Sequence, residues 1–250
     1  MKVLVEGLAT EYRDDGSGPV WLYLHGWKDD IHTFDALITS LNEHRSVRLD
    51  LPGFGASEIP KNSWSVADYV QFVRAFTDKI DVTPDVIIGH SMGGRIAIRG
   101  VADGVFKPRR LVLIASAGVA ERNAFRARGL LILAKIAKAI TSLPPLDRMQ
   151  EPLRRFIYGP ARSDYENSGP LRKTFLKVIS ENLSSAAEKI TVPTLLIWGS
   201  RDEATPLEEG ERLYALISSS KLDVAEGVGH FVHRDVPDKV AKYMRDFCDS

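Results

Sequence analysis

The stretch that decides the fold reads VIIGHSMGGRIA and covers residues 86–97. Its apolar start is typical of a buried strand, and the apolar residues resume as a helix-compatible segment over 96–101. Between the two, Ser91 stands in a Gly-x-Ser-x-Gly pattern bounded by Gly89 and Gly93. A strand that turns sharply into a helix around a single serine is the pattern of a nucleophile elbow.

The two glycines of this pattern have a direct physical reason. The turn is so tight that a side chain at Gly89 or Gly93 is expected to collide with neighbouring backbone. Such a turn lifts the Ser91 hydroxyl clear of the sheet and leaves the first N–H groups of the helix unpaired. The pattern therefore predicts Ser91 as a nucleophile. An acid and a base must then follow it in the order Ser, Asp or Glu, His.

Length and composition fit a globular protein with a buried core rather than a dedicated nucleic-acid binder. The chain has 250 residues, of which 44% are hydrophobic and 26% charged. These values suit one large α/β domain, or one domain with an insertion. Lys plus Arg and Asp plus Glu number 33 each, so the chain lacks the basic excess of a dedicated nucleic-acid binder.

The sequence predicts a cytoplasmic chain without disulfides. Cys248 is the single cysteine, so no disulfide can form within the chain. The start, 1–6, has too short an apolar run for a signal peptide, and no stretch of about 18 apolar residues predicts a transmembrane helix.

Strand-like and helix-like segments alternate along most of the chain. Strands are expected over 2–6, 9–13, 20–24, 47–49, 86–88, 109–115, 194–199 and 222–225. Helices are expected over 33–43, 65–80, 96–101, 206–217 (with Thr205 as N-cap) and 236–247. The first two strands are expected to form a hairpin at a sheet edge. The alternation predicts an α/β fold, with a mostly parallel sheet and helices on both faces.

The alternation stops over 119–189, where no strand-like run occurs. Helices are expected there over 121–141, 153–158 and 171–183, and the block holds thirteen Lys or Arg against seven Asp or Glu, a net charge of +6. We interpret it as a helical cap inserted into a core made of 1–118 and 190–250. Two questions stay open: whether the charge attracts anionic substrates, and whether the apolar run over 129–136 roofs the pocket or touches lipid.

Residues that carry chemistry follow the predicted strands at their carboxyl ends. In a parallel sheet these ends share one edge, and ligands bind there. The residues are His25, Asp50, Ser91, Ser116, Asp202 and His230. Their shared placement predicts one functional site assembled from distant parts of the chain.

The motifs together resemble those of the α/β-hydrolase family, in the form that carries a helical cap. They are His25-Gly26-Trp27, Asp50-Leu51-Pro52-Gly53-Phe54-Gly55-Ala56-Ser57, Gly89-His90-Ser91-Met92-Gly93-Gly94, Trp198-Gly199-Ser200-Arg201-Asp202 and Gly227-Val228-Gly229-His230-Phe231. The resemblance covers about 20–247, but no motif matches within the cap. The glycines and the proline of the 50–57 motif are expected to be structural.

This resemblance implies a catalytic role for five residues. Ser91 is the expected nucleophile, His230 the base and Asp202 the residue that orients the base, with the backbone N–H groups of Trp27 and Met92 as the oxyanion hole. Alternatives remain for two of the roles, namely His233 as the base and Asp223 or Asp235 as the acid. His90 is expected to be a packed neighbour of Ser91, and His32 and His44 to lie at the surface.

The function expected of such a site is the hydrolysis of carboxylic esters through an acyl-enzyme. The same triad serves C–C bond hydrolases and lyases on diketo acids, thioesterases and lactonases, and some proteins of this fold are ligand receptors. We expect a small-molecule ester or related acyl substrate, no nucleic acid, no cofactor and no metal. Monomer and homodimer both stay open.

Overall fold

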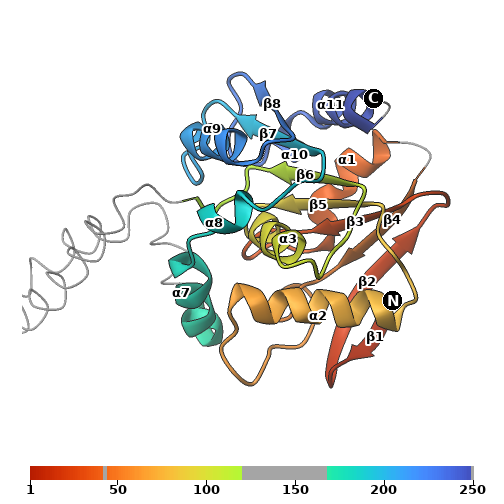
Figure 1. The fold of residues 1–250 in the computed structure, drawn as a ribbon. Coiled ribbons are helices and arrows are strands. Elements are labelled where there is room, and N and C mark those ends of the chain that lie inside the picture. The colour runs from red at the N-terminus through yellow and green to blue at the C-terminus, as the bar shows by residue number, and fades with distance from the viewer. Residues whose placement is uncertain (42–43, 120–167, 249–250) are drawn as a thin grey trace, which may run out of the picture.

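Figure 1 shows the fold of the computed structural model, which describes residues 1–41, 44–119 and 168–248. The strands of this part are β1 (Lys2–Val5), β2 (Leu8–Asp15), β3 (Val20–Leu24), β4 (Arg45–Leu49), β5 (Val86–His90), β6 (Arg110–Ile114), β7 (Thr194–Gly199) and β8 (Ser220–Ala225). They form one sheet in the order β1-β2-β4-β3-β5-β6-β7-β8. β2 pairs antiparallel with β1 and β4, and all other neighbours are parallel. The predicted parallel sheet and its edge hairpin are therefore confirmed.

Helices cover both faces of this sheet (Figure 1). The described ones are η1 (Ile31–Phe34), α1 (Asp35–Thr39), α2 (Val66–Lys79), α3 (Met92–Ala102), η4 (Gly169–Leu171), α7 (Arg172–Ser180), α8 (Ser184–Ala187), α9 (Leu207–Leu216), α10 (Val232–Asp235) and α11 (Pro237–Cys248). No helix in this part of the chain combines the length and apolarity that crossing a bilayer requires.

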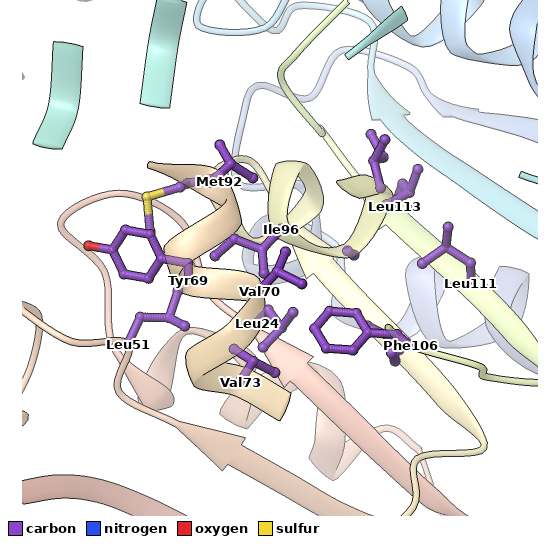
Figure 2. Close-up of a cluster of buried hydrophobic side chains, with 14 of the residues drawn as sticks. Leu24, Leu51, Tyr69, Val70, Val73, Met92, Ile96, Phe106, Leu111 and Leu113 are labelled. Carbon is purple, nitrogen blue, oxygen red and sulfur yellow. The ribbon is translucent and has the colours of Figure 1, made fainter. Parts of the chain in front are cut away.

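The alternation of side chains along each strand divides the core into two layers. In β3, Leu22 and Leu24 point into a cluster shared with α2, α3, α8 and α9. Trp21 and Tyr23 point the other way, into a cluster shared with α1, α10 and α11. Successive residues of a strand face opposite sides, so a strand buried on both sides must be apolar throughout. Figure 2 shows part of the first cluster, in which Leu24 and Ile96 lie among side chains of α2.

Helix α2 illustrates how the sequence sets both ends and the buried face of an element. Ser65 accepts a hydrogen bond from the Asp68 N–H, and the Asp68 carboxylate accepts one from the Ser65 N–H, which makes a capping box. The apolar residues Tyr69, Val73 and Phe76 recur at spacings of three and four and are fully buried. Tyr69 and Val73 belong to the buried cluster that Figure 2 shows.

Some helix boundaries differ from the prediction. Helix α3 begins at Met92, directly after the nucleophile, and not at residue 96. Gly93 and Gly94 in its first turn have low helix propensity, which made this turn look non-helical in the sequence. The turn is nevertheless helical, and Gly94 lets it pack closely on the residues that follow β6, because a Cβ there would overlap the Ser116 side chain. The helix expected over 33–43 is shorter, because it divides into η1 and α1 and α1 ends at Thr39.

Part of the predicted cap lies outside the described residues. This holds for the helices expected over 121–141 and 153–158 and for the apolar run over 129–136. The helix expected over 171–183 is present as α7, and a short helix, α8, follows it. Figure 1 places α7 at one end of α2, beside the carboxyl edge of the sheet.

The glycines of the elbow make room for closely packed backbone, as predicted. A Cβ at Gly89 would lie 2.6 Å from the Gly93 carbonyl oxygen, and a Cβ at Gly93 would overlap the Leu24 carbonyl oxygen. Neither glycine has a positive φ; the strained residue of the turn is Ser91 itself, at φ 51° and ψ −109°. The glycines therefore provide space, while the nucleophile carries the backbone strain.

We expect Gly93→Ala to destabilise the fold by about 3 kcal/mol or more, since the added methyl would press on the backbone of β3, which cannot rotate away. Gly229→Ala is the matched control, because its methyl would come no closer than 4.0 Å to the Arg201 carbonyl oxygen. It should stay within about 1 kcal/mol of the parent. Urea unfolding of both variants measures the difference, and equal stabilities would contradict the packing argument.

Candidate active site

The turns after β5 and β7 and the loop after β8 bring three predicted residues to one edge of the sheet. Ser91 lies between β5 and α3, Asp202 follows β7, and His230 lies between β8 and α10. Gly199 at the end of β7 is packed against the loop of His230, because a Cβ there would overlap the Val228 carbonyl oxygen. This close approach brings the loops of Asp202 and His230 together.

Asp202 and His230 form a hydrogen-bonded pair. Asp202 Oδ2 lies 2.8 Å from His230 Nδ1, and the Asp202 side chain is fully buried while that of His230 is 16% exposed. The other oxygen, Oδ1, accepts hydrogen bonds from the N–H groups of Ala204 and Thr205, both at 2.9 Å. A carboxylate only accepts, so His230 Nδ1 carries the proton and Nε2 has a free lone pair. This is the tautomer that a general base requires.

The Thr205 hydroxyl also contacts this pair. The Thr205 hydroxyl lies 2.8 Å from Asp202 Oδ2, 3.2 Å from His230 Nδ1 and 3.0 Å from the Ala115 carbonyl oxygen. The prediction that it caps α9 is wrong: Pro206 occupies the cap position, and no side chain bonds there. The spacing of three residues between Asp202 and Thr205 was the one sequence feature that could have indicated this contact. Pro206, which follows Thr205, favoured the interpretation of Thr205 as a helix cap.

Ser91 opens into a pocket of about 510 Å³. The pocket is lined by Gly26, Trp27, Lys28, His90, Ser91, Met92, Arg95, Ala117, Phe175, Val178, Ile179, Ala204, Thr205, Glu209, His230 and Phe231. Ser91 and His230 thus share one cavity, and Asp202 lies behind the histidine. The side chains from α7 line the same cavity, so the described end of the 119–189 segment borders it.

The two residues predicted for the oxyanion hole flank the same pocket. Met92 is the first residue of α3, where a helix leaves its N–H without an intrahelical partner. Trp27 follows the carboxyl end of β3, and its ring packs on Phe54 and Phe175 at centroid distances of 4.9 and 5.0 Å. The Trp27 side chain thus forms part of the pocket wall.

His25 connects the loop of Trp27 to the loop that begins at Asp50. Its Nδ1 donates to the Gly26 carbonyl oxygen at 2.8 Å, and its Nε2 accepts from the Leu51 N–H at 2.9 Å. Both nitrogens are therefore satisfied only in the neutral ring, and burial lowers the pKa of His25. The loop itself is held by Asp50, which accepts from the N–H groups of Ile31 and Ala56. The predicted structural role of 50–57 agrees with these bonds.

We expect His25 to make the fold sensitive to acid. Below about pH 6.5 the unfolded chain takes up a proton on this histidine while the folded chain does not, so the free energy of unfolding falls by up to about 1.4 kcal/mol per pH unit. His25→Gln should be less stable at pH 7 but lose less stability between pH 6.5 and 5. Urea unfolding across this range measures both slopes, and parallel slopes would contradict the assignment.

For the other histidines, the predicted environment agrees with the structure in some cases and not in others. His90 is buried, and its Nε2 donates to the His230 carbonyl oxygen at 3.2 Å, so the prediction of a packed neighbour is confirmed. His233 lies in α10, fully buried, and its Nε2 meets Thr33 Oγ1 at 3.0 Å. The prediction for His44 is wrong: it is only 8% exposed and bonds the Tyr23 hydroxyl at 2.8 Å. His32 is exposed, as expected.

The sheet order, the strained serine after β5 and the carboxylate–histidine pair after β7 and β8 define the class of α/β hydrolases. A sequence model described as the alpha/beta hydrolase family matches residues 21–243. The chain therefore belongs to the alpha/beta hydrolase family, whose members are hydrolytic enzymes in the comparisons below.

The chain is similar along most of its length to proteins of several activities. It is 29% identical to the monoacylglycerol lipase ABHD6 of Mus musculus over 94% of this chain and 77% of the relative. It is 25% identical to a 2-hydroxy-6-oxononadienedioate/2-hydroxy-6-oxononatrienedioate hydrolase of Pseudomonas sp over 93% and 85%. Among solved structures, a bacterial membrane phospholipase A is 26% identical, with a TM-score of 0.76 over all of this chain and 85% of that one.

Proposed function

We propose that this protein hydrolyses carboxylic esters through an acyl-enzyme formed on Ser91. The observation that carries the proposal is the combination of Ser91 and His230 in one pocket with the 2.8 Å hydrogen bond from His230 Nδ1 to Asp202. A serine hydroxyl is a weak nucleophile until a base takes its proton. His230 can serve as this base through Nε2, because its other ring nitrogen, Nδ1, is bonded to Asp202.

The proposed reaction has two halves. As Ser91 Oγ attacks the ester carbonyl carbon, His230 Nε2 takes the hydroxyl proton, and the resulting oxyanion accepts hydrogen bonds from the N–H groups of Trp27 and Met92. The C–O bond then breaks, and His230 returns the proton to the leaving alcohol. In the second half, water gives a proton to His230 and attacks the acyl carbon. His230 then returns this proton to Ser91 Oγ as the acyl C–O bond breaks, which releases the acid and restores Ser91. Asp202 orients the imidazole and stabilises its charged form in both halves.

The pocket wall favours a partly apolar substrate. Six of its side chains are large and apolar, those of Trp27, Met92, Phe175, Val178, Ile179 and Phe231. Arg95 lies in this wall, but its Nη1 already donates to the carbonyl oxygens of Val178 and Glu181, both at 3.0 Å. The acidic Glu209 lines the same pocket, so its charge opposes the binding of an anion at Arg95. The named activity of the mouse relative, a monoacylglycerol lipase, agrees with an ester substrate.

A second candidate is hydrolysis of a C–C bond in a diketo acid by the same three residues. The observation in its favour is the similarity to the Pseudomonas hydrolase, whose name specifies a dioate substrate. Its substrate carboxylates would require a cation in the pocket, for which Arg95 is one of the described candidates. Lys28 is the other cation among the described lining residues. We place this candidate second, because the Arg95 guanidinium is already engaged by two carbonyl oxygens and the acidic Glu209 lines the same pocket.

We propose further that 119–189 forms a cap over this pocket. The support is that Phe175, Val178 and Ile179 of α7 line the same cavity as Ser91 and His230. A cap that closes over the site would exclude water and set the length of acyl chain that fits.

The experiment that separates the two activities compares two substrate classes on the same enzyme. 4-Nitrophenyl esters with acyl chains of graded length are measured beside a vinylogous 2-hydroxy-6-oxo-dienoate. We expect turnover of the esters with a kcat/KM that varies with chain length. Turnover of the dienoate without any ester hydrolysis would reject the ester proposal and favour the C–C hydrolase.

A further inference from the structure

Behind the proposed catalytic residues lies a second group of potential ligands that the reaction does not use. One donor atom from each of Asp29, His90 and His233 lies within 4.8 Å of one from each of the other two. His90 and His233 are 1% and 0% exposed, and Asp29 is half-buried. The rings of the two histidines approach to a centroid distance of 4.4 Å.

Each of the three residues has one polar atom bonded and one spare. His90 Nε2 donates to the His230 carbonyl oxygen, His233 Nε2 meets Thr33 Oγ1, and Asp29 Oδ1 accepts from the Asp30 N–H at 3.1 Å. The remaining atoms, Asp29 Oδ2, His90 Nδ1 and His233 Nδ1, are buried and have no hydrogen-bond partner among the described residues.

Three buried polar atoms left without a partner would cost several kcal/mol unless something binds them. His90 Nε2 must carry the ring proton, because a carbonyl oxygen can only accept, so Nδ1 of the neutral ring presents a lone pair. This atom points toward the turn that carries Asp29, since a Cβ on Gly26 would lie 3.0 Å from it. The Asp29 N–H closes the same turn on the Gly26 carbonyl oxygen at 3.4 Å.

We propose that Asp29, His90 and His233 bind a divalent transition-metal ion, with Zn²⁺ as the best match. Two imidazole nitrogens and one carboxylate oxygen form a common ligand set for zinc, and a water molecule completes the tetrahedron. The hydrogen bond on the other nitrogen of each histidine fixes the orientation of its ring, as such bonds commonly do for histidines that bind a metal ion. The carboxylate supplies the negative charge that two neutral rings lack.

Such an ion would join three segments that carry the proposed catalytic groups. Asp29 lies two residues after Trp27, His90 precedes Ser91, and His233 follows His230 in the next helix. The role that this position supports is a structural clip that holds these loops together, since neither Asp29 nor His233 is among the residues that line the pocket and Asp202 already orients His230. Metal binding to the folded chain alone then raises the stability of the enzyme.

The test uses the full chain, freed of metal with EDTA and titrated with ZnCl₂, beside MgCl₂ as a hard-ion control. At about 100 times the dissociation constant we expect the Tm to rise by roughly 5–10 °C, with one ion bound per chain by competition with a chromophoric chelator. MgCl₂ should cause no shift. Asp29→Asn and His233→Gln should each abolish the zinc-dependent rise.

Two controls exclude other histidine–carboxylate pairs as the binding site. His230→Ala removes the pair with Asp202, and His32→Ala removes the surface pair with Asp35, which lies at 2.9 Å. Both variants should keep the rise in Tm. Absence of the rise in the parent, or its loss in His230→Ala with retention in Asp29→Asn, would overturn the proposal. If His233→Gln fails to fold, Asp29→Asn decides alone, because Asn retains the oxygen that accepts from the Asp30 N–H.

Discussion

Replacement of Ser91 by alanine is expected to reduce kcat for ester hydrolysis by about 10⁴-fold or more, to the level that the oxyanion hole and binding supply alone. Alanine keeps the Cβ and removes only the oxygen that forms the acyl bond. The variant also keeps the backbone strain of the turn, where φ is 51°, so its free energy of unfolding should stay within about 1 kcal/mol of the parent. Steady-state kinetics with 4-nitrophenyl esters and urea unfolding measure the two quantities.

The control is a second serine at the same edge of the sheet. Ser116 is fully buried after β6, and within the described part of the chain its hydroxyl makes a single long contact, of 3.4 Å, to the Ala117 carbonyl oxygen. Ser116→Ala should keep kcat within about tenfold of the parent. Ester turnover in Ser91→Ala at more than a hundredth of the parent rate would show that another group forms the acyl bond.

Asp202→Asn should lower kcat by about 10³–10⁴-fold with a smaller effect on KM. The amide can present an N–H to His230 Nδ1, so the histidine would shift its proton to Nε2 and lose the lone pair that activates Ser91. Asp202 Oδ1 accepts from the N–H groups of both Ala204 and Thr205, so an amide oxygen at that position keeps these two bonds. We therefore expect the free energy of unfolding to stay within about 1 kcal/mol of the parent while the rate falls.

Two variants of Thr205 separate orientation of the histidine from simple damage to the fold. Thr205→Val removes the hydroxyl that lies 2.8 Å from Asp202 Oδ2 but leaves the bond from Asp202 to His230, so we expect a loss of about tenfold in kcat. Thr205→Ser keeps the hydroxyl and should recover most of the lost kcat.

An Asp202→Asn enzyme with more than a tenth of the parent kcat would show that Asp202 does not orient His230.

The fold could be predicted from the sequence because its signals are local and repeated. Strands such as β5 are short apolar runs bounded by turn residues, and helices such as α2 show apolar spacing with a capping serine. Ser91 could be predicted because Gly89 and Gly93, which flank it, leave room for closely packed backbone. Because the carboxyl ends of parallel strands share one edge of the sheet, the sequence also predicted that Asp202 and His230 lie near Ser91.

The parts that could not be predicted depend on contacts between distant segments. His44 looks like a surface residue by its polar neighbours, but it is buried because the Tyr23 hydroxyl gives it a partner. Thr205 contacts Asp202 and Ala115 because β6 and β7 lie side by side. The group of Asp29, His90 and His233 comes from three loops and follows no ligand spacing along the chain.

The measurement that tests the central claim most directly is covalent trapping of the nucleophile. The enzyme is treated with a fluorophosphonate, and the modified site is located by intact mass and peptide mapping. The account predicts a single adduct per chain on Ser91 that forms as ester hydrolysis is lost and is absent in Ser91→Ala. Loss of activity with the adduct on another residue, or full modification of Ser91 with ester hydrolysis unchanged, would contradict it.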